Sequence, residues 1–66
     1  MQIKLNGKEL ILEKEISLLE FLITRQIDPR LAIIEHNELI INNEDWANVL
    51  IKENDSLEVL RFIGGG

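Results

Sequence analysis

The strongest constraint on the fold is a helix start, because Ser17-Leu18-Leu19-Glu20 fits the capping box. In this motif the serine side chain accepts a hydrogen bond from the third helical N–H, and the glutamate reaches back to the serine N–H. The apolar stripe that follows at helical spacing consists of Leu18, Leu19, Leu22 and Ile23. Because Pro29 disfavours helical angles at Asp28, we predict one helix over residues 18–26.

Strand patterns occupy most of the remaining chain. Asn6-Gly7 predicts a tight hairpin, since a type I′ turn needs positive φ at both central positions. Strands are expected over residues 2–6, 8–13, 31–35 and 39–41, and from 57 almost to the terminal glycines. The expected order is therefore ββαβ, followed by an irregular segment and a final strand, with no internal repeat.

Size and charge exclude several classes of protein. A chain of 66 residues can bury only about 60% of its unfolded surface, so a large internal active-site cavity is not expected. The absence of cysteine excludes disulfides, a thiolate metal site and a thiol nucleophile. A formal charge of −5 opposes nucleic-acid binding and favours a partner with a basic face. The longest apolar run, residues 31–34, is too short to span a membrane, and we expect a cytoplasmic protein.

Side chains that could carry chemistry are few. His36 has no second histidine beside it and is interpreted as a surface turn residue. Four acidic residues are interpreted as solvated charged residues of loops: Glu44, Asp45, Glu53 and Asp55. We interpret Trp46 as a residue that covers one end of the core. The chain also lacks a Walker-type loop and a nucleophile-base set. We therefore expect no catalytic side chain and no metal, and we do not expect an enzyme.

The sequence ends in three glycines directly after a hydrophobic strand, Arg61-Phe62-Ile63-Gly64-Gly65-Gly66. Glycine lacks a Cβ, so such a tail is thin and flexible enough to enter a channel too narrow for side chains. Three extended residues carry the terminal carboxylate on the order of 10 Å beyond Ile63. A carboxylate is also the group that an ATP-dependent adenylating enzyme activates. The bland alternative is a frayed terminus.

The order of elements, the glycine end and the length together resemble the ThiS family of ubiquitin-like β-grasp sulfur carriers. The likeness covers the whole chain. Its segments are Asn6-Gly7, Ser17-Leu18-Leu19-Glu20-Phe21-Leu22, Asn42 to Trp46-Ala47, Asn54-Asp55 and Phe62-Ile63-Gly64-Gly65-Gly66.

The resemblance implies an α+β fold, in which a mixed sheet of four to five strands packs on one helix and the first and last strands are parallel neighbours at its centre. Residues 1–63 would form the domain and residues 64–66 a flexible tail. A ThiF-like adenylyltransferase would use ATP and magnesium to adenylate Gly66. Sulfur from a donor enzyme would then leave a thiocarboxylate for a ThiG-like thiazole synthase. Gly64 and Gly65 would thread into the partner, although the third glycine leaves open whether Gly64 belongs to the strand end.

The final strand also predicts a partner-binding surface. If Leu57 and Val59 face the helix, then Glu58, Leu60 and Phe62 lie on the opposite face of the sheet. Two large apolar side chains beside the reactive terminus suit a docking surface. The alternative is that Phe62 folds over an edge of the core.

Other functions remain open at this point. The chain could be a molybdopterin-pathway carrier or another carrier of the same fold. It could also be a ubiquitin-like binding module whose tail does nothing, or a protein that is conjugated to lysines through the same activated tail. Removal of Gly65-Gly66 separates a carrier from a binding module, since only the carrier needs these residues.

Overall fold

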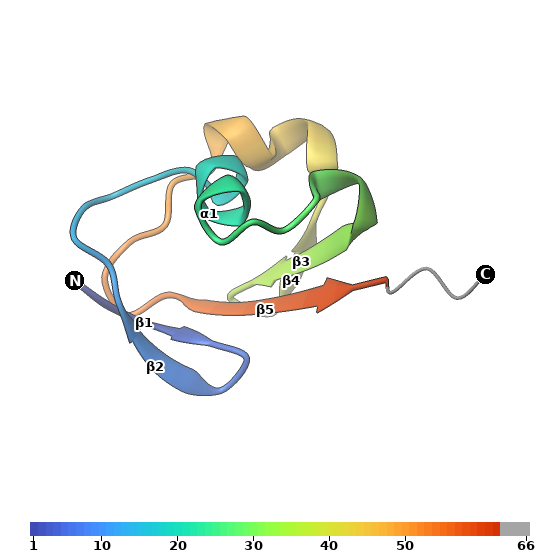
Figure 1. Cartoon of the computed structure of the whole chain (residues 1–66). Coiled ribbons are helices and arrows are strands. Elements are labelled where there is room, and N and C mark those ends of the chain that lie inside the picture. The colour runs from blue at the N-terminus through green and yellow to red at the C-terminus, as the bar shows by residue number, and fades with distance from the viewer. Residues whose placement is uncertain (63–66) are drawn as a thin grey trace.

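The computed structural model describes residues 1–62. Its elements are β1 (Gln2–Leu5), β2 (Lys8–Ile11), α1 (Leu18–Thr24), the 3₁₀ helix η1 (Pro29–Leu31), β3 (Ala32–His36), β4 (Leu39–Ile41), the 3₁₀ helix η2 (Asn43–Asn48) and β5 (Ser56–Arg61). The strands form one sheet in the order β2-β1-β5-β3-β4, and α1 lies across one face of it (Figure 1). β1 and β5 are parallel neighbours at the centre, and the other pairs are antiparallel, which confirms the predicted β-grasp.

The first hairpin turns where the sequence predicts. Asn6 and Gly7 have φ of 52° and 82°, the two positive values that a type I′ turn requires. Leu5 and Lys8 pair directly across the turn. Both strands are shorter than predicted, since β1 ends at Leu5 and β2 ends at Ile11.

The helix begins as predicted and ends early. The Glu20 N–H donates to Ser17 Oγ at 3.1 Å, and the Glu20 carboxylate accepts from the Ser17 N–H, so the capping box is complete. α1 ends at Thr24 because Gln26 adopts φ of 59°. The Gln26 N–H bonds to the Ile23 carbonyl and the Ile27 N–H to the Leu22 carbonyl, which is a Schellman cap. The predicted span of 18–26 was therefore two residues too long.

The buried face of α1 also differs from the predicted stripe. Leu18, Phe21 and Leu22 are fully buried, whereas Ile23 is 58% exposed. Because α1 has only about two turns and carries apolar residues on more than one face, the sequence alone does not decide which face packs against the core. The structure selects the face that contains the larger aromatic side chain.

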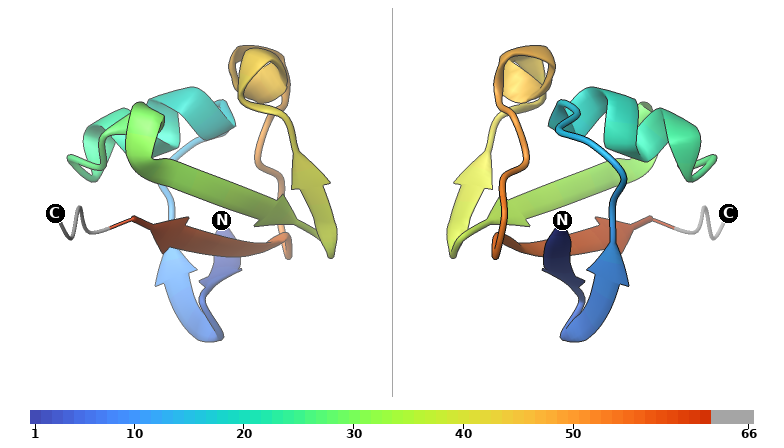
Figure 2. Two further views of the ribbon diagram at one scale, coloured as in Figure 1. Left: turned by 90° about the vertical axis from the view of Figure 1, so that its right-hand side faces the viewer. Right: turned by 90° about the vertical axis from the view of Figure 1, so that its left-hand side faces the viewer.

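The core lies between α1, η2 and the helix-facing side of the sheet. Its buried apolar residues are Ile3, Leu18, Phe21, Leu22, Ile34, Trp46, Ile51, Leu57 and Val59. Trp46 is 2% exposed and donates its indole N–H to the Ile41 carbonyl at 3.0 Å, which confirms its predicted place in the core. Figure 2 shows η2 beside α1 on the same face of the sheet. No helix within residues 1–62 is long and apolar enough to cross a membrane.

Candidate functional site

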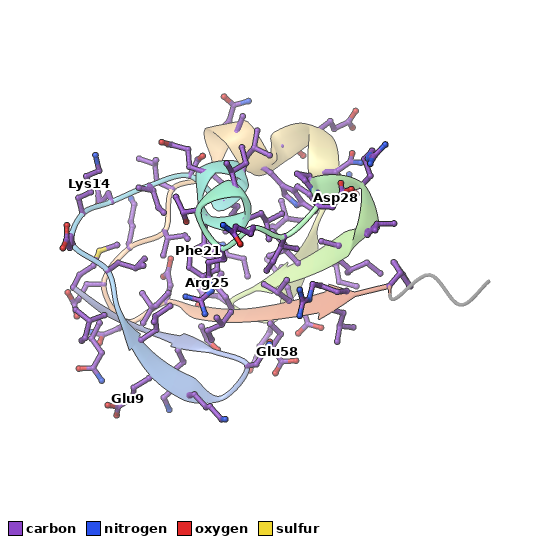
Figure 3. All side chains as sticks on the ribbon, viewed as in Figure 1. Glu9, Lys14, Phe21, Arg25, Asp28 and Glu58 are labelled. Atoms are coloured by element: carbon purple, nitrogen blue, oxygen red, sulfur yellow. The ribbon has the colours of Figure 1, made fainter. Side chains whose placement is uncertain are left out.

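The outer face of β5, the face away from α1, carries the predicted surface residues. Leu57 and Val59 point into the core, whereas Glu58, Leu60 and Phe62 are exposed. Leu60 is 63% exposed and Phe62 is 57% exposed, so Phe62 does not fold into the core. Figure 3 shows Glu58 on the side of β5 away from α1. The role of these residues in partner binding stays a prediction.

Neighbouring strands extend this apolar surface. Ile33 on β3 lies directly opposite Leu60, and Glu35 lies opposite both Glu58 and Ile40 on β4. Residues directly opposite each other in antiparallel strands share a face of the sheet. We therefore define the outer patch as Ile33, Ile40, Leu60 and Phe62. Ile33 and Ile40 were not predicted from the sequence, because their place on this face follows from the pairing of β3 with β5 and with β4.

Two carboxylates interrupt the outer patch. Glu35 and Glu58 are cross-strand partners, and like charges in that position repel each other. Among residues 1–62, neither carboxylate lies within ion-pair distance of a lysine or arginine. This face therefore combines apolar contact area with an unneutralised negative charge, which suits a partner that presents a basic side chain.

The strand that leads to the glycines is held to the sheet on both sides. The Phe62 N–H donates to the Leu31 carbonyl at 2.7 Å, which continues the contact with the β3 side beyond the end of β5. The predicted acceptor Gly66 and the predicted threading residues Gly64 and Gly65 lie outside the described residues.

On its other side, β5 is hydrogen-bonded by the side chain of Asn6, which takes the place of a neighbouring strand's backbone. Asn6 Oδ1 accepts from the Val59 N–H at 2.8 Å, and Asn6 Nδ2 donates to the Val59 carbonyl at 3.3 Å. The Asn6 N–H also donates to the Leu57 carbonyl at 2.8 Å. Because β1 turns away at Leu5, these bonds extend the pairing of β5 by two residues. Sequence reasoning placed Asn6 at the end of the first strand and in the turn, and did not predict its side-chain bonds to Val59.

The His36 region proves to be structural rather than solvated. His36 Nε2 lies 2.7 Å from Asp55 Oδ2, and the same carboxylate accepts from Asn37 Nδ2 and from the Lys52 N–H. Burial alone would raise the pKa of Asp55, but the bonds from His36, Lys52 and Asn37 outweigh it and lower that pKa. The interpretations of His36 as a surface turn residue and of Asp55 as solvated polarity were wrong, since this cluster ties two turns together.

Within residues 1–62, His, Asp and Glu side chains form no group of three that could hold a metal ion. A hollow of about 580 Å³ beside β3, β4 and η2 adjoins the outer patch, since Ile33 and Ile40 line it together with residues such as Trp46 and Asn42. The outer patch, in which Ile33 is half-buried and the other three side chains are exposed, is the candidate functional surface.

A five-stranded mixed sheet with a central parallel pair, one capped helix and an exposed outer face defines a ubiquitin-like β-grasp domain. The model of the ThiS family matches residues 2–66. The chain belongs to the ThiS family of sulfur carriers.

Similar proteins cover the full length of the chain. It is 31% identical to the sulfur carrier protein ThiS of Bacillus subtilis over 65 residues, which are 97% of this chain and 98% of that protein. The crystal structure of the thiamine biosynthesis protein ThiS from Geobacter metallireducens superimposes with a TM-score of 0.86 at 25% identity, and covers all of both chains. All 66 residues also match a segment of a thiazole synthase from Magnetococcus marinus at 32% identity, and that segment is 20% of the enzyme.

Proposed function

We propose that this protein carries sulfur as a thiocarboxylate on Gly66 and donates it for synthesis of the thiamin thiazole ring. The observation that carries the proposal is the family match over residues 2–66, which includes the three glycines. The similarity to a sulfur carrier along nearly its whole length supports the same conclusion. In this proposal the protein is a co-substrate of other enzymes and supplies no catalytic side chain of its own.

The chemistry proceeds in two stages at the Gly66 carboxyl group. In the site of a ThiF-like adenylyltransferase, a carboxylate oxygen attacks the α-phosphorus of magnesium-bound ATP and pyrophosphate leaves. A persulfide sulfur from a donor enzyme then attacks the acyl-adenylate and displaces AMP. Cleavage of the resulting S–S bond by a thiol reductant leaves the thiocarboxylate. Gly64 and Gly65 suit this path because bare backbone fits a channel that a Cβ would narrow.

A thiazole synthase is the proposed consumer of the sulfur. The Magnetococcus marinus enzyme contains, in its own chain, a segment similar to the whole of this protein. Linking two modules in one chain raises their effective concentration to the millimolar range for short linkers, which favours modules that act together. This arrangement supports a thiazole synthase as the partner of the separate carrier.

The outer patch is the proposed docking surface for the adenylyltransferase. It includes Phe62, the last described residue before the glycines, so a partner that covers it is well placed to receive the tail. Glu35 and Glu58 on this face favour a basic side chain on the partner. Such charges mainly raise the association rate, and salt weakens their effect.

Pyrophosphate exchange with a ThiF-like adenylyltransferase tests the proposal. The full chain should support exchange, whereas deletion of Gly66 or Gly65→Leu should abolish it. Neither change should lower the melting temperature, because neither removes a side chain that could pack in the core. Lys14→Gln is a matched control for an exposed site away from the tail. Normal exchange by the deletion variant would contradict the proposed mechanism.

A further inference from the structure

Two arginines line one hollow beside the end of β5. Arg25 follows the last turn of α1, and Arg61 is the last residue of β5. Both line a hollow of about 200 Å³, together with Leu5, Asn6, Ile27 and Val59. Figure 3 shows Arg25 extending from the end of α1 toward the sheet. The chain contains 12 acidic residues and only 7 lysines and arginines. A pair of arginines in one place therefore gives this site a charge opposite in sign to the net charge of the chain.

The hollow exists because the elements around it end early. Leu57 and Val59 are buried under α1, and Arg61 is the next residue of β5 on the same face. α1 has already ended at Thr24, and β1 has ended at Leu5. Arg61 therefore occupies a core-facing position of the strand beyond the ends of α1 and β1, and its side chain is exposed.

Neither guanidinium is neutralised within the described residues 1–62. Arg25 contacts a π face, since its guanidinium carbon lies 5.7 Å from the centroid of the Phe21 ring. Asp28 lines an adjoining hollow with Arg61, but two bonds from Arg30, of 2.8 and 3.2 Å, already occupy that carboxylate. The contact with Arg30 lowers the pKa of Asp28 to about 2. This carboxylate is thus already paired with Arg30.

We infer that the hollow between Arg25 and Arg61 binds a carboxylate side chain of the adenylyltransferase, and so forms a second, oppositely charged contact beside the tail. This inference rests on the proposed function. Two planar guanidinium groups can each form paired hydrogen bonds with a carboxylate. Basic partner groups would face Glu35 and Glu58, and an acidic group would face the two arginines. Opposite charges at two positions fix the orientation in which the carrier docks, because a reversed orientation would bring like charges together.

A protein carboxylate fits this hollow better than a free anion. Among residues 1–62, Asn6 is the only other polar side chain in the lining, and both of its polar atoms are already bonded to Val59. A free anion would therefore meet two exposed cations in water, where such contacts contribute little. A docked protein also covers the neighbouring surface and excludes water, which strengthens each charge contact.

The test compares two double variants of equal net charge. Arg25→Gln/Arg61→Gln removes both guanidiniums from the hollow. Lys14→Gln/Lys52→Gln removes two exposed positive charges from residues that do not line it. Binding of each to the purified adenylyltransferase is measured by calorimetry at low and at physiological salt. Melting temperatures are measured in parallel, since the first variant also loses the contact of Arg25 with Phe21.

The arginine variant should bind about tenfold more weakly or worse, a loss of ~1.4 kcal/mol, and its binding should depend less on salt. The lysine control should stay within about twofold of the wild type, and Arg25→Lys/Arg61→Lys should recover part of the affinity. If the arginine variant binds as tightly as the lysine control, this inference is wrong while the proposed function stands. If the unmodified chain does not bind the enzyme at all, both are overturned.

Discussion

Replacement of Asn6 by glycine should weaken the attachment of β5 to the first hairpin, although the backbone pairing of β1 with β5 remains. The substitution keeps the turn, because glycine adopts the φ of 52° without strain. It removes the two side-chain bonds to Val59, one at 2.8 Å and one at 3.3 Å. Val59 is only 7% exposed, so water reaches its freed backbone groups poorly. An unsatisfied buried group costs about 1–3 kcal/mol, and the longer bond is weak, so we expect a loss of ~1–2 kcal/mol.

The matched control is Asn54→Gly. Asn54 also has a positive φ, of 69°, and within residues 1–62 its side chain makes no hydrogen bond. Both variants gain the same freedom in the unfolded chain, and the difference between them isolates the bonds to Val59. In a domain of this size ~1 kcal/mol corresponds to about 4–8 °C in melting temperature. Urea unfolding and amide exchange at Val59 provide the measurements. Equal stability of the two variants, with Val59 still protected, would refute the role of Asn6.

Two further predictions concern the docking surface and acid stability. Leu60→Ala and Phe62→Ala should each weaken binding to the adenylyltransferase by about 1–2 kcal/mol, with little loss of stability. The control is Ile11→Ala, which truncates a similarly exposed apolar side chain on β2 and should leave binding unchanged. If the first two variants bind as tightly as the third, docking occurs elsewhere. Asp55→Ala should lower the free energy of unfolding by about 1–3 kcal/mol at neutral pH, because the hydrogen bonds to its carboxylate are lost. Asp45→Ala, at an exposed site, is the control and should change the free energy of unfolding little. Because folding lowers the pKa of Asp55, the ionised carboxylate stabilises the protein above pH ~4. This contribution disappears as the pH falls through the pKa of Asp55 in the folded protein. The stability of Asp55→Ala should therefore decline less in acid than that of the wild type. An unchanged acid profile would contradict this.

Local signals in the sequence predicted the elements that depend on neighbouring residues. Asn6-Gly7 defines its turn through backbone preferences, and residues 17–20 define the helix start through bonds within one turn. The end of α1 escaped prediction because Gln26 has no intrinsic preference for positive φ. Pro29 was taken as the stop signal, although the chain leaves the helix earlier.

The missed parts of the candidate site depend on contacts between distant residues. Asn6 and Val59 are 53 positions apart, and His36 and Asp55 are 19 apart, so no local pattern links them. Arg25 and Arg61 line one hollow only because α1 and β1 end before β5 does. By contrast, the outer position of Leu60 followed from strand alternation alone, since the pleat assigns each residue to a face.

Intact-mass measurement of the chain is the most direct test of the central claim. The chain is incubated with a ThiF-like adenylyltransferase, ATP, magnesium, a sulfur donor and a thiol reductant. The account predicts a mass increase equal to the replacement of one oxygen atom by sulfur, located in the fragment that contains Gly66 and absent without ATP or after deletion of Gly66. An unchanged mass under conditions in which the Bacillus subtilis ThiS protein acquires sulfur would contradict it, and so would sulfur located at any other residue.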